Sequence, residues 1–409
     1  MNEGTIIKSS ARLMESTGDE LSLLGFGCMR FPKKGRRIDM EATEQLIRRA
    51  IAGGVNYFDT AYIYPGSEEA LGTVLAKAGP DGMRLRDRVK IATKLPVIFI
   101  RSREGMDEKI GKSLSRLKTD CIDYYLIHSL PGFEEWDRVK RLGVLDFIEK
   151  QRSAGRIKHI GFSWHGNLAD FRKVVDDYDW DFCQIQYNYV DEHFQAGTEG
   201  LKYAAEKGLG IVIMEPLRGG TLAGDLPPEA ARIIKRRRDE EGQAMSAAYW
   251  GLRWVMDRPE VCVVLSGMNT TEQLDENMTA AADSTPCSLS SADAEMINSI
   301  AAVYKSRTKV PCTGCSYCMP CPRGVDIPTC LSSYNNKAVF GRIRSDVMYL
   351  ARTGGKSPGR ASRCIRCGAC EKKCPQRIEI MDGLSGAAKA MEKPWLTIPV
   401  AIALKLLGR

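Results

Sequence analysis

The chain has 409 residues, of which 44% are hydrophobic and 27% are charged, and its formal net charge is +8. This length suits two or three domains with a large apolar core, which excludes disorder, a collagen-like fibre or a coiled coil as the main state. No run of about 18 apolar residues and no amino-terminal signal pattern is found, so we expect a soluble, cytoplasmic protein without a membrane span.

Short β-rich segments alternate with helical patterns along the first three quarters of the chain. The helical pattern is seen in the apolar residues at three-to-four spacing within residues 40–51 and 110–117. Eight β/α repeats in about 250 residues are typical of a closed parallel barrel, whose functional residues lie at the carboxyl ends of the strands. The eight predicted strands are residues 23–29, 57–61, 89–94, 122–128, 159–164, 182–187, 210–215 and 261–266.

A doubly wound sheet is the competing fold. Its dinucleotide-binding form carries a GxGxxG motif directly after the first strand. Here that place holds Gly25-Phe26-Gly27-Cys28, which lacks the third glycine. The sequence therefore favours an α/β fold of the (β/α)8 TIM-barrel type, with residues 1–300 as the barrel domain.

Four polar residues follow three successive predicted strands. Asp59 and Tyr64 come at the end of the second, Lys94 ends the third and His128 ends the fourth. Each of them alone has an ordinary structural explanation, but together they suit one reaction. A tyrosine hydroxyl, with a pKa near 10, acts as a general acid only when a cation and a hydrogen-bonding group shift its proton equilibrium. Lys94 supplies the cation, His128 the hydrogen bond, and Asp59 holds Lys94.

The motifs that contain these residues resemble those of the aldo-keto reductase superfamily. They are residues 56–64 (NYFDTAYIY), 91–94 (IATK), 123–128 (DYYLIH), 160–163 (IGFS), 184–188 (QIQYN) and 266–277, and the resemblance extends from about residue 23 to 278. It implies a barrel that binds NADP or NAD, and a catalytic tetrad of Asp59, Tyr64, Lys94 and His128. It also implies that Tyr64 protonates a carbonyl oxygen while hydride passes to the carbonyl carbon, or the reverse. The substrate would be a small carbonyl compound or alcohol.

The cofactor residues carry over from this resemblance less cleanly. Ser163 and Gln186 match positions that hold the nicotinamide carboxamide, but Trp164 stands in place of a common asparagine. Met214 replaces the aromatic ring that usually stacks on the nicotinamide. The loop after it, with Pro216, Leu217 and Arg218, would pass over the pyrophosphate or is simply a flexible loop.

The segment after the eighth predicted strand resembles the adenosine-side site. Gln273, Glu276 and Asn277 stand at the matching places. The basic residue that would hold a 2′-phosphate is absent, because Asn269 and Thr270 are neutral where a phosphate monoester favours Arg or Lys. The choice between NADP and NAD is therefore open.

Nine of the 14 cysteines lie between Cys312 and Cys374. They include two motifs that each end in Cys-Pro, the second with the x2, x2, x3 spacing of bacterial ferredoxins. We expect two [4Fe–4S] clusters, with structural zinc as the less favoured alternative. Cys330 is a spare thiol that could substitute for a ligand. The predicted ligands are Cys312, Cys315, Cys318 and Cys374 for one cluster, and Cys364, Cys367, Cys370 and Cys321 for the other.

Residues 301–409 are therefore expected to form a small α-helical ferredoxin-like iron-sulfur domain, with a helical stretch near residues 336–350. From residue 309 onward the chain has 17 Lys and Arg against 6 Asp and Glu, whereas the preceding part has 42 against 45. This charge offsets bound clusters or provides a docking surface for an acidic electron-transfer protein. Nucleic acid is not expected as a partner, because no recognition motif accompanies the charge. The apolar segment 395–407 is expected to pack on the barrel or on a second subunit.

Three functional hypotheses follow. In the first, the barrel is an NAD(P)H-dependent carbonyl reductase that the iron-sulfur module stabilises or anchors to a partner. In the second, the clusters exchange electrons with an external ferredoxin or flavoprotein. In the third, which is non-enzymatic, the barrel senses nucleotides and the clusters report redox state. The complete tetrad favours an enzyme.

Overall fold

The computed structural model describes residues 7–224, 226–241, 245–312, 317–340, 346, 349–350, 353–354, 359–374, 376–395 and 397. The chain forms two compact units, of which Met1–Gly224 with Met245–Ala294 make the first and Asp225–Ala244 with Glu295–Arg409 make the second. Among the described residues, every helix is too short or too polar to cross a membrane.

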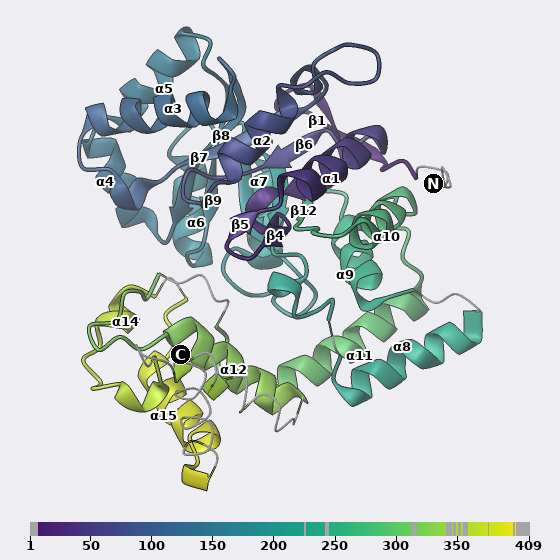
Figure 1. Cartoon of the computed structure of the whole chain (residues 1–409), viewed down its shortest axis with the longest axis vertical. Coiled ribbons are helices and arrows are strands. Elements are labelled where there is room, and N and C mark those ends of the chain that lie inside the picture. The colour runs from purple at the N-terminus through teal and green to yellow at the C-terminus, as the bar shows by residue number, and fades with distance from the viewer. Residues whose placement is uncertain are drawn as a thin grey trace. The chain divides into compact units, whose positions relative to one another are not determined.

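Eight parallel strands of the first unit close into a barrel (Figure 1), which confirms the predicted fold class. In space the strands follow the order β10-β11-β12-β3-β6-β7-β8-β9. Each predicted strand corresponds to an observed one to within two residues at either end. Their bounds are β3 (Leu24–Gly27), β6 (Tyr57–Asp59), β7 (Lys90–Leu95), β8 (Ile122–Leu130), β9 (Ile157–Trp164), β10 (Phe182–Gln186), β11 (Gly210–Met214) and β12 (Val261–Ser266).

Helices surround the barrel and connect its strands. Several begin at a side chain that accepts a hydrogen bond from an otherwise unpaired backbone N–H, among them Asp39, Ser102 and Asn167. The helices of this unit are α1 (Met40–Ala52), α2 (Ser67–Leu75), α3 (Arg103–Leu117), α4 (Phe133–Arg141), α5 (Val144–Ser153), α6 (Leu168–Asp176), α7 (Gly197–Glu206), α9 (Ala247–Met256) and α10 (Thr271–Ala282).

A hairpin of β1 (Ala11–Met14) and β2 (Asp19–Ser22) closes the amino-terminal end of the barrel. Its Met14 is fully buried in one apolar cluster with strand residues such as Tyr57 and Phe182. The fit is tight, because a β-carbon at Gly210 would lie 2.4 Å from the Met14 sulfur. Since the strands are parallel, their carboxyl ends lie at the other end of the barrel.

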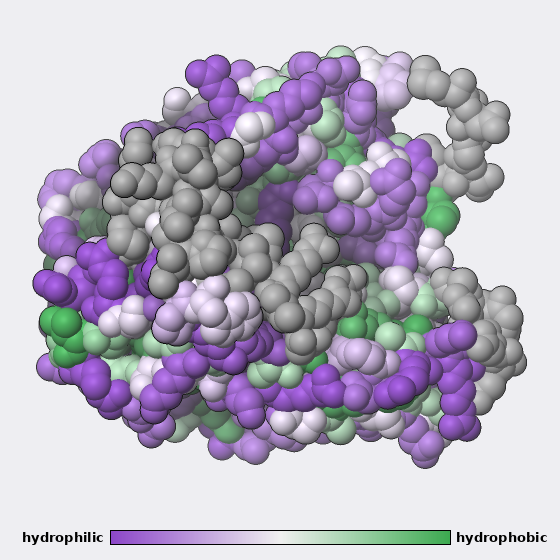
Figure 2. Space-filling model, turned by 60° about the horizontal axis from the view of Figure 1, so that its bottom comes forward, coloured by the Kyte–Doolittle hydropathy of each residue, from purple (hydrophilic) through white to green (hydrophobic). Residues whose placement is uncertain are grey.

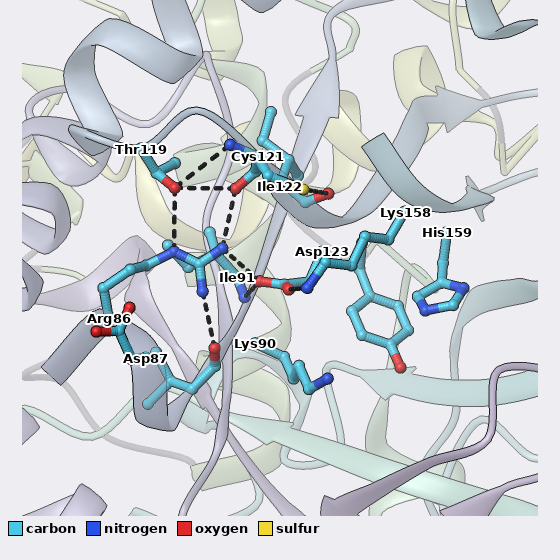
Figure 3. Close-up of polar contacts among 12 residues, drawn as sticks. Arg86, Asp87, Lys90, Ile91, Thr119, Cys121, Ile122, Asp123, Lys158 and His159 are labelled. Carbon is cyan, nitrogen blue, oxygen red and sulfur yellow. Dashed lines mark hydrogen bonds and ion pairs between the residues drawn. The ribbon is translucent and has the colours of Figure 1, made fainter. Parts of the chain in front are cut away.

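A buried carboxylate near the amino end of β8 anchors this closed end (Figure 3). Asp123 accepts hydrogen bonds from the Arg86 guanidinium at 2.7 Å, from Lys158 Nζ at 2.8 Å and from the Ile91 N–H at 2.9 Å. A buried carboxylate with this many donors is satisfied, so the cluster ties neighbouring strands together. We assign it to stability because it lies at the end of the barrel away from the strand carboxyl ends.

The second unit is helical (Figure 1). Its core is built from residues such as Val325, Leu331 and Leu384, against which several cysteines pack. The predicted helical stretch 336–350 coincides with a described helix only as far as residue 340, and most of the rest of it, like almost all of segment 395–407, lies outside the described residues. The helices are α8 (Pro228–Glu241), α11 (Ser291–Arg307), which begins in the first unit, α12 (Ile327–Phe340), α14 (Ala369–Lys372) and α15 (Ile380–Met391).

Hydrophilic residues predominate on the face shown in Figure 2, and hydrophobic residues form small separate groups there. Large apolar side chains that are well exposed include Trp395 at 62% and Ile365 at 57%. Ile365 stands in the second cysteine motif.

Candidate active site

The carboxyl ends of β6 and β7 bring Asp59 and Lys94 into a buried ion pair. Lys94 Nζ donates to Asp59 Oδ2 at 2.6 Å and to the Thr60 carbonyl at 2.7 Å. Gln184 of β10 donates from Nε2 to the same carboxylate oxygen at 3.1 Å. Burial raises the pKa of Asp59, while the Lys94 charge and these hydrogen bonds act against that shift. The pair therefore fixes the ammonium group at the mouth of the barrel.

Tyr64 and His128 lie around this ammonium group. Tyr64 stands in the turn between β6 and α2, is partly exposed, and places its ring centroid 5.6 Å from Lys94 Nζ. The Tyr64 and His128 ring centroids are 6.3 Å apart with an interplanar angle of 83°. Burial, the Lys94 charge and the nearby His165 lower the pKa of His128 well below its ordinary value. His128 is therefore a neutral imidazole at neutral pH, suited to hydrogen bonding.

Two of the expected nicotinamide residues lie at neighbouring strand ends. Ser163 is buried in β9, and its Oγ accepts a hydrogen bond from the Ser129 N–H at 2.6 Å. Gln186 ends β10, where its Nε2 donates to Asp191 at 3.2 Å and its Oε1 accepts from Gln195 at 3.0 Å. The Gln186 amide is thus held in place by neighbours on both sides.

Trp164 and Met214, the two residues that depart from the family pattern, differ in their surroundings. Trp164 turns into the protein, where its indole N–H donates to the Gly166 carbonyl at 2.9 Å and its ring packs against Phe171. It therefore takes a structural part instead of replacing the amide of an asparagine. Met214 is partly buried at the end of β11, beside the apolar core.

The loop after β11 is held by charged groups from two other loops. Arg218 Nε lies 3.2 Å from Asp191 Oδ2, and Arg30 donates to the Gly219 carbonyl at 2.8 Å. Pro216 and Leu217 are buried in the first turn of the loop. Glu215 and Arg218 both have positive φ angles, of 54° and 48°. These contacts hold the loop in a defined shape, and its part in cofactor binding stays a prediction.

The predicted adenosine-side residues lie around the start of α10. Gln273 Oε1 accepts from the Asn269 N–H at 2.9 Å, and Asn277 donates to Ser266 Oγ at 2.8 Å. Glu276 is partly buried on the same helix. The helix amino terminus, together with Arg30 and Arg218, gives this end of the barrel donors and positive charge that suit an anionic dinucleotide.

Sequence reasoning missed four residues of this region. Gln184 could have been found from its spacing, because it lies two positions before Gln186 and so faces the same side of the strand. Arg30, Asp191 and Glu215 follow three different strands, and their proximity became visible only when the barrel closed.

Seven of the eight predicted cluster ligands are described, and Cys315 lies outside the described residues. Cys318 and Cys370 are buried in the core of the second unit, and Cys312, Cys321, Cys364 and Cys374 pack against it. Cys367 is exposed. Among these described residues, no three or more metal-ligating side chains are arranged to hold a metal ion. The chemistry of the donor set, which consists of thiols, fits iron-sulfur clusters.

Comparison with known proteins identifies both parts of the chain. The chain belongs to the aldo/keto reductase family, whose model matches residues 23–302 and so covers all eight barrel strands. A 4Fe-4S dicluster domain matches residues 311–379. These matches confirm the resemblance inferred from the strand-end and cysteine motifs.

Curated relatives are similar to the barrel part. The NADH-specific methylglyoxal reductase of Escherichia coli is 26% identical over 70% of this chain and 96% of its own length. The L-galactose dehydrogenase of Arabidopsis thaliana is 25% identical over 67% of this chain and 88% of its own. The holo form of an aldo-keto reductase from Bacillus halodurans superposes with a TM-score of 0.57, with 22% identity over 71% of this chain and 96% of its own, which bears on the fold alone.

Proposed function

We propose that this protein is an NAD(P)H-dependent oxidoreductase that reduces a small aldehyde or ketone to an alcohol, or catalyses the reverse reaction. The observation that carries the proposal is the buried Lys94–Asp59 pair beneath the partly exposed Tyr64 ring. Two relatives are named as a methylglyoxal reductase and an L-galactose dehydrogenase, and both names are those of oxidoreductases with small carbonyl-containing substrates.

The residues divide the work as follows. Tyr64 gives its hydroxyl proton to the carbonyl oxygen. The Lys94 charge stabilises the tyrosinate that remains, and Asp59 with Gln184 keeps Lys94 in position. His128, neutral at neutral pH, orients the carbonyl oxygen by a hydrogen bond. A bound nicotinamide supplies or accepts the hydride, and Ser163 and Gln186 orient its carboxamide.

Replacement of Tyr64 by phenylalanine tests the proposed acid. We expect Tyr64→Phe to lower kcat by about 10²–10⁴-fold, while the Kd for the nicotinamide cofactor changes by less than about twofold. Initial rates with methylglyoxal and a panel of aldehydes and ketones, and cofactor binding by fluorescence titration, give both values.

Tyr62→Phe is the matched control for this experiment. Tyr62 lies in the same turn, with its ring against Arg116 and Lys109 on the outside of the barrel. Its loss should leave kcat within about twofold. Equal turnover of Tyr64→Phe and the wild type would contradict the proposed mechanism.

A second candidate function is electron exchange with an acidic carrier protein at the second cysteine motif. There Cys367 and Ile365 are exposed next to the basic side chains of Arg366, Lys372 and Lys373. Arg366 pairs with Asp382 at 2.7 Å, whereas Lys372 and Lys373 are exposed. An exposed apolar residue and exposed lysines in the same motif as a predicted cluster ligand suit a negatively charged one-electron partner.

Salt dependence tests this second candidate. After reduction of the clusters by dithionite, we expect the rate of electron transfer to an acidic ferredoxin to fall about tenfold from about 20 to 300 mM NaCl. The variant Lys372→Glu/Lys373→Glu should show the low rate already at low salt. Lys202→Glu, an exposed charge on α7 of the barrel, serves as the control. A salt-independent rate, or an unaffected double variant, would contradict the docking surface.

A further inference from the structure

Glu215 is an acid in an unusual setting. It follows β11 directly and is held at a φ of 54°, which few residues other than glycine adopt. Its Oε2 is screened from solvent and, within the described part of the chain, has no hydrogen-bond partner. A buried carboxyl oxygen without a donor disfavours the ionised form of the side chain.

Charged groups from three loops face this carboxyl. Arg30 approaches from the loop after β3, Asp191 from the loop after β10, and Arg218 from the loop that contains Glu215 itself. Arg30 donates to the Gly219 carbonyl at 2.8 Å, and a β-carbon at Gly267 would lie only 3.3 Å from Arg30 Cδ. The Arg30 side chain therefore spans the loops after β11 and β12.

The balance of these charges depends on the state of Glu215. Asp191 is already engaged by Arg218 at 3.2 Å and by the side-chain amides of Gln186 and Asn188, each at 3.2 Å. An ionised Glu215 would therefore offset the remaining cation, Arg30. A neutral Glu215 leaves the cluster with net positive charge and adds an O–H donor, and both favour a phosphate-like anion.

Burial, reinforced by the Asp191 charge, raises the pKa of Glu215 to about 7, whereas Arg30 and Arg218 act in the opposite direction. Near neutral pH a comparable fraction of molecules then has Glu215 in each protonation state. The approach of an anion would favour the neutral state further.

We propose that Glu215 binds the pyrophosphate part of the nicotinamide cofactor in its neutral form, donating its carboxyl proton, so that cofactor binding takes up a proton from solvent. This inference rests on the proposed function, because it concerns the cofactor of that reaction. Above the pKa of Glu215 in the free protein, binding must first protonate the carboxylate, so affinity falls as pH rises. Below it the carboxyl is already neutral and affinity is constant.

The experiment is calorimetric titration of the full-length protein with NADH and with NADPH from pH 6 to 9, in buffers of different ionisation enthalpy. We expect an uptake approaching one proton at pH 8, and a Kd about twentyfold larger at pH 8.5 than at pH 6.5. Glu215→Gln keeps a donor but does not titrate, so it should lose both the proton uptake and this pH dependence.

Two further variants sharpen the test. Glu206→Gln removes an exposed acid on α7 and should behave as the wild type does. Arg30→Gln removes a cation that lowers the pKa of Glu215, so binding should weaken at pH 6.5 and the onset of pH dependence should move to higher pH. The 2′-phosphate of NADPH has a pKa of about 6 of its own, and comparison with Glu215→Gln removes its contribution.

The outcomes separate the two proposals. Failure of both dinucleotides to bind would overturn the proposed function and this inference with it. Binding without proton uptake in the wild type, or with the same pH dependence in Glu215→Gln, would overturn the inference and leave the proposed function intact. The proton uptake of the wild type is measured without any variant, so the test does not depend on how Glu215→Gln folds.

Discussion

Lys94 is a fully buried ammonium group whose charge is balanced by one carboxylate. Its side chain is 2% exposed and that of Asp59 is 7% exposed, with 2.6 Å between Nζ and Oδ2. An ion pair of this kind adds little to stability when both partners are present, but the loss of one partner leaves an uncompensated buried charge. The pair thus couples the proposed chemistry to the stability of the barrel.

We expect Lys94→Met to lower the free energy of unfolding by about 3–5 kcal/mol, because Asp59 then retains only its amide partner, Gln184. The double variant Lys94→Met/Asp59→Leu should recover part of this loss. Urea unfolding of both variants and of Asp59→Leu, followed by circular dichroism, gives the coupling between the two residues.

Additive effects in this cycle would contradict a buried ion pair. Both Lys94 variants should be inactive in carbonyl reduction, because the proposed mechanism needs the ammonium group. Recovery of stability without recovery of activity is therefore the expected pattern.

Among the elements of the second unit, α12 carries a buried cysteine, whereas the turn before α14 carries an exposed one. Cys330 lies on this helix, fully buried, and its thiol contacts the Gly359 carbonyl at 3.4 Å and the Tyr349 hydroxyl at 3.8 Å. Cys367, in the turn before α14, is exposed. Because the Cys330 thiol is enclosed in the core and contacts two oxygen atoms there, we expect it to be a packed core residue and not a cluster ligand.

Replacement of these two cysteines by serine distinguishes their roles. We expect Cys367→Ser to lower the iron content and the absorbance near 400 nm of anaerobically purified protein. Cys330→Ser should leave both unchanged, which makes it the matched control. Iron analysis of both variants decides the matter, and a loss of iron in Cys330→Ser would show that the spare thiol is a ligand.

In the whole molecule, the barrel and the iron-sulfur domain are expected to use cofactors that transfer different numbers of electrons. A nicotinamide transfers two electrons as hydride, whereas a [4Fe–4S] cluster exchanges one at a time, and a flavin is the usual converter between them. The two family models match separate ranges, residues 23–302 and 311–379. Whether electrons pass between these two parts is a question for experiment.

An anaerobic titration of the iron-replete protein tests whether the two parts exchange electrons. We expect the barrel to be a self-contained reductase, so NADPH and NADH should leave the cluster absorbance and the EPR signal unchanged, and dithionite should reduce the clusters fully. Bleaching of the clusters by either nucleotide would contradict a self-contained barrel and would require a one-electron converter.

The barrel, its eight strands and the four residues of the predicted tetrad could be inferred from the sequence, because short apolar runs and strand-end motifs are local properties of the chain. Asp59 and Lys94 end neighbouring strands, so their contact followed from topology. The grouping of Gln184 with this pair, and of Arg30 and Asp191 with Glu215, was decided only by the tertiary structure. Barrel closure joins loops that are far apart in sequence, and the resulting burial changes the protonation of their side chains.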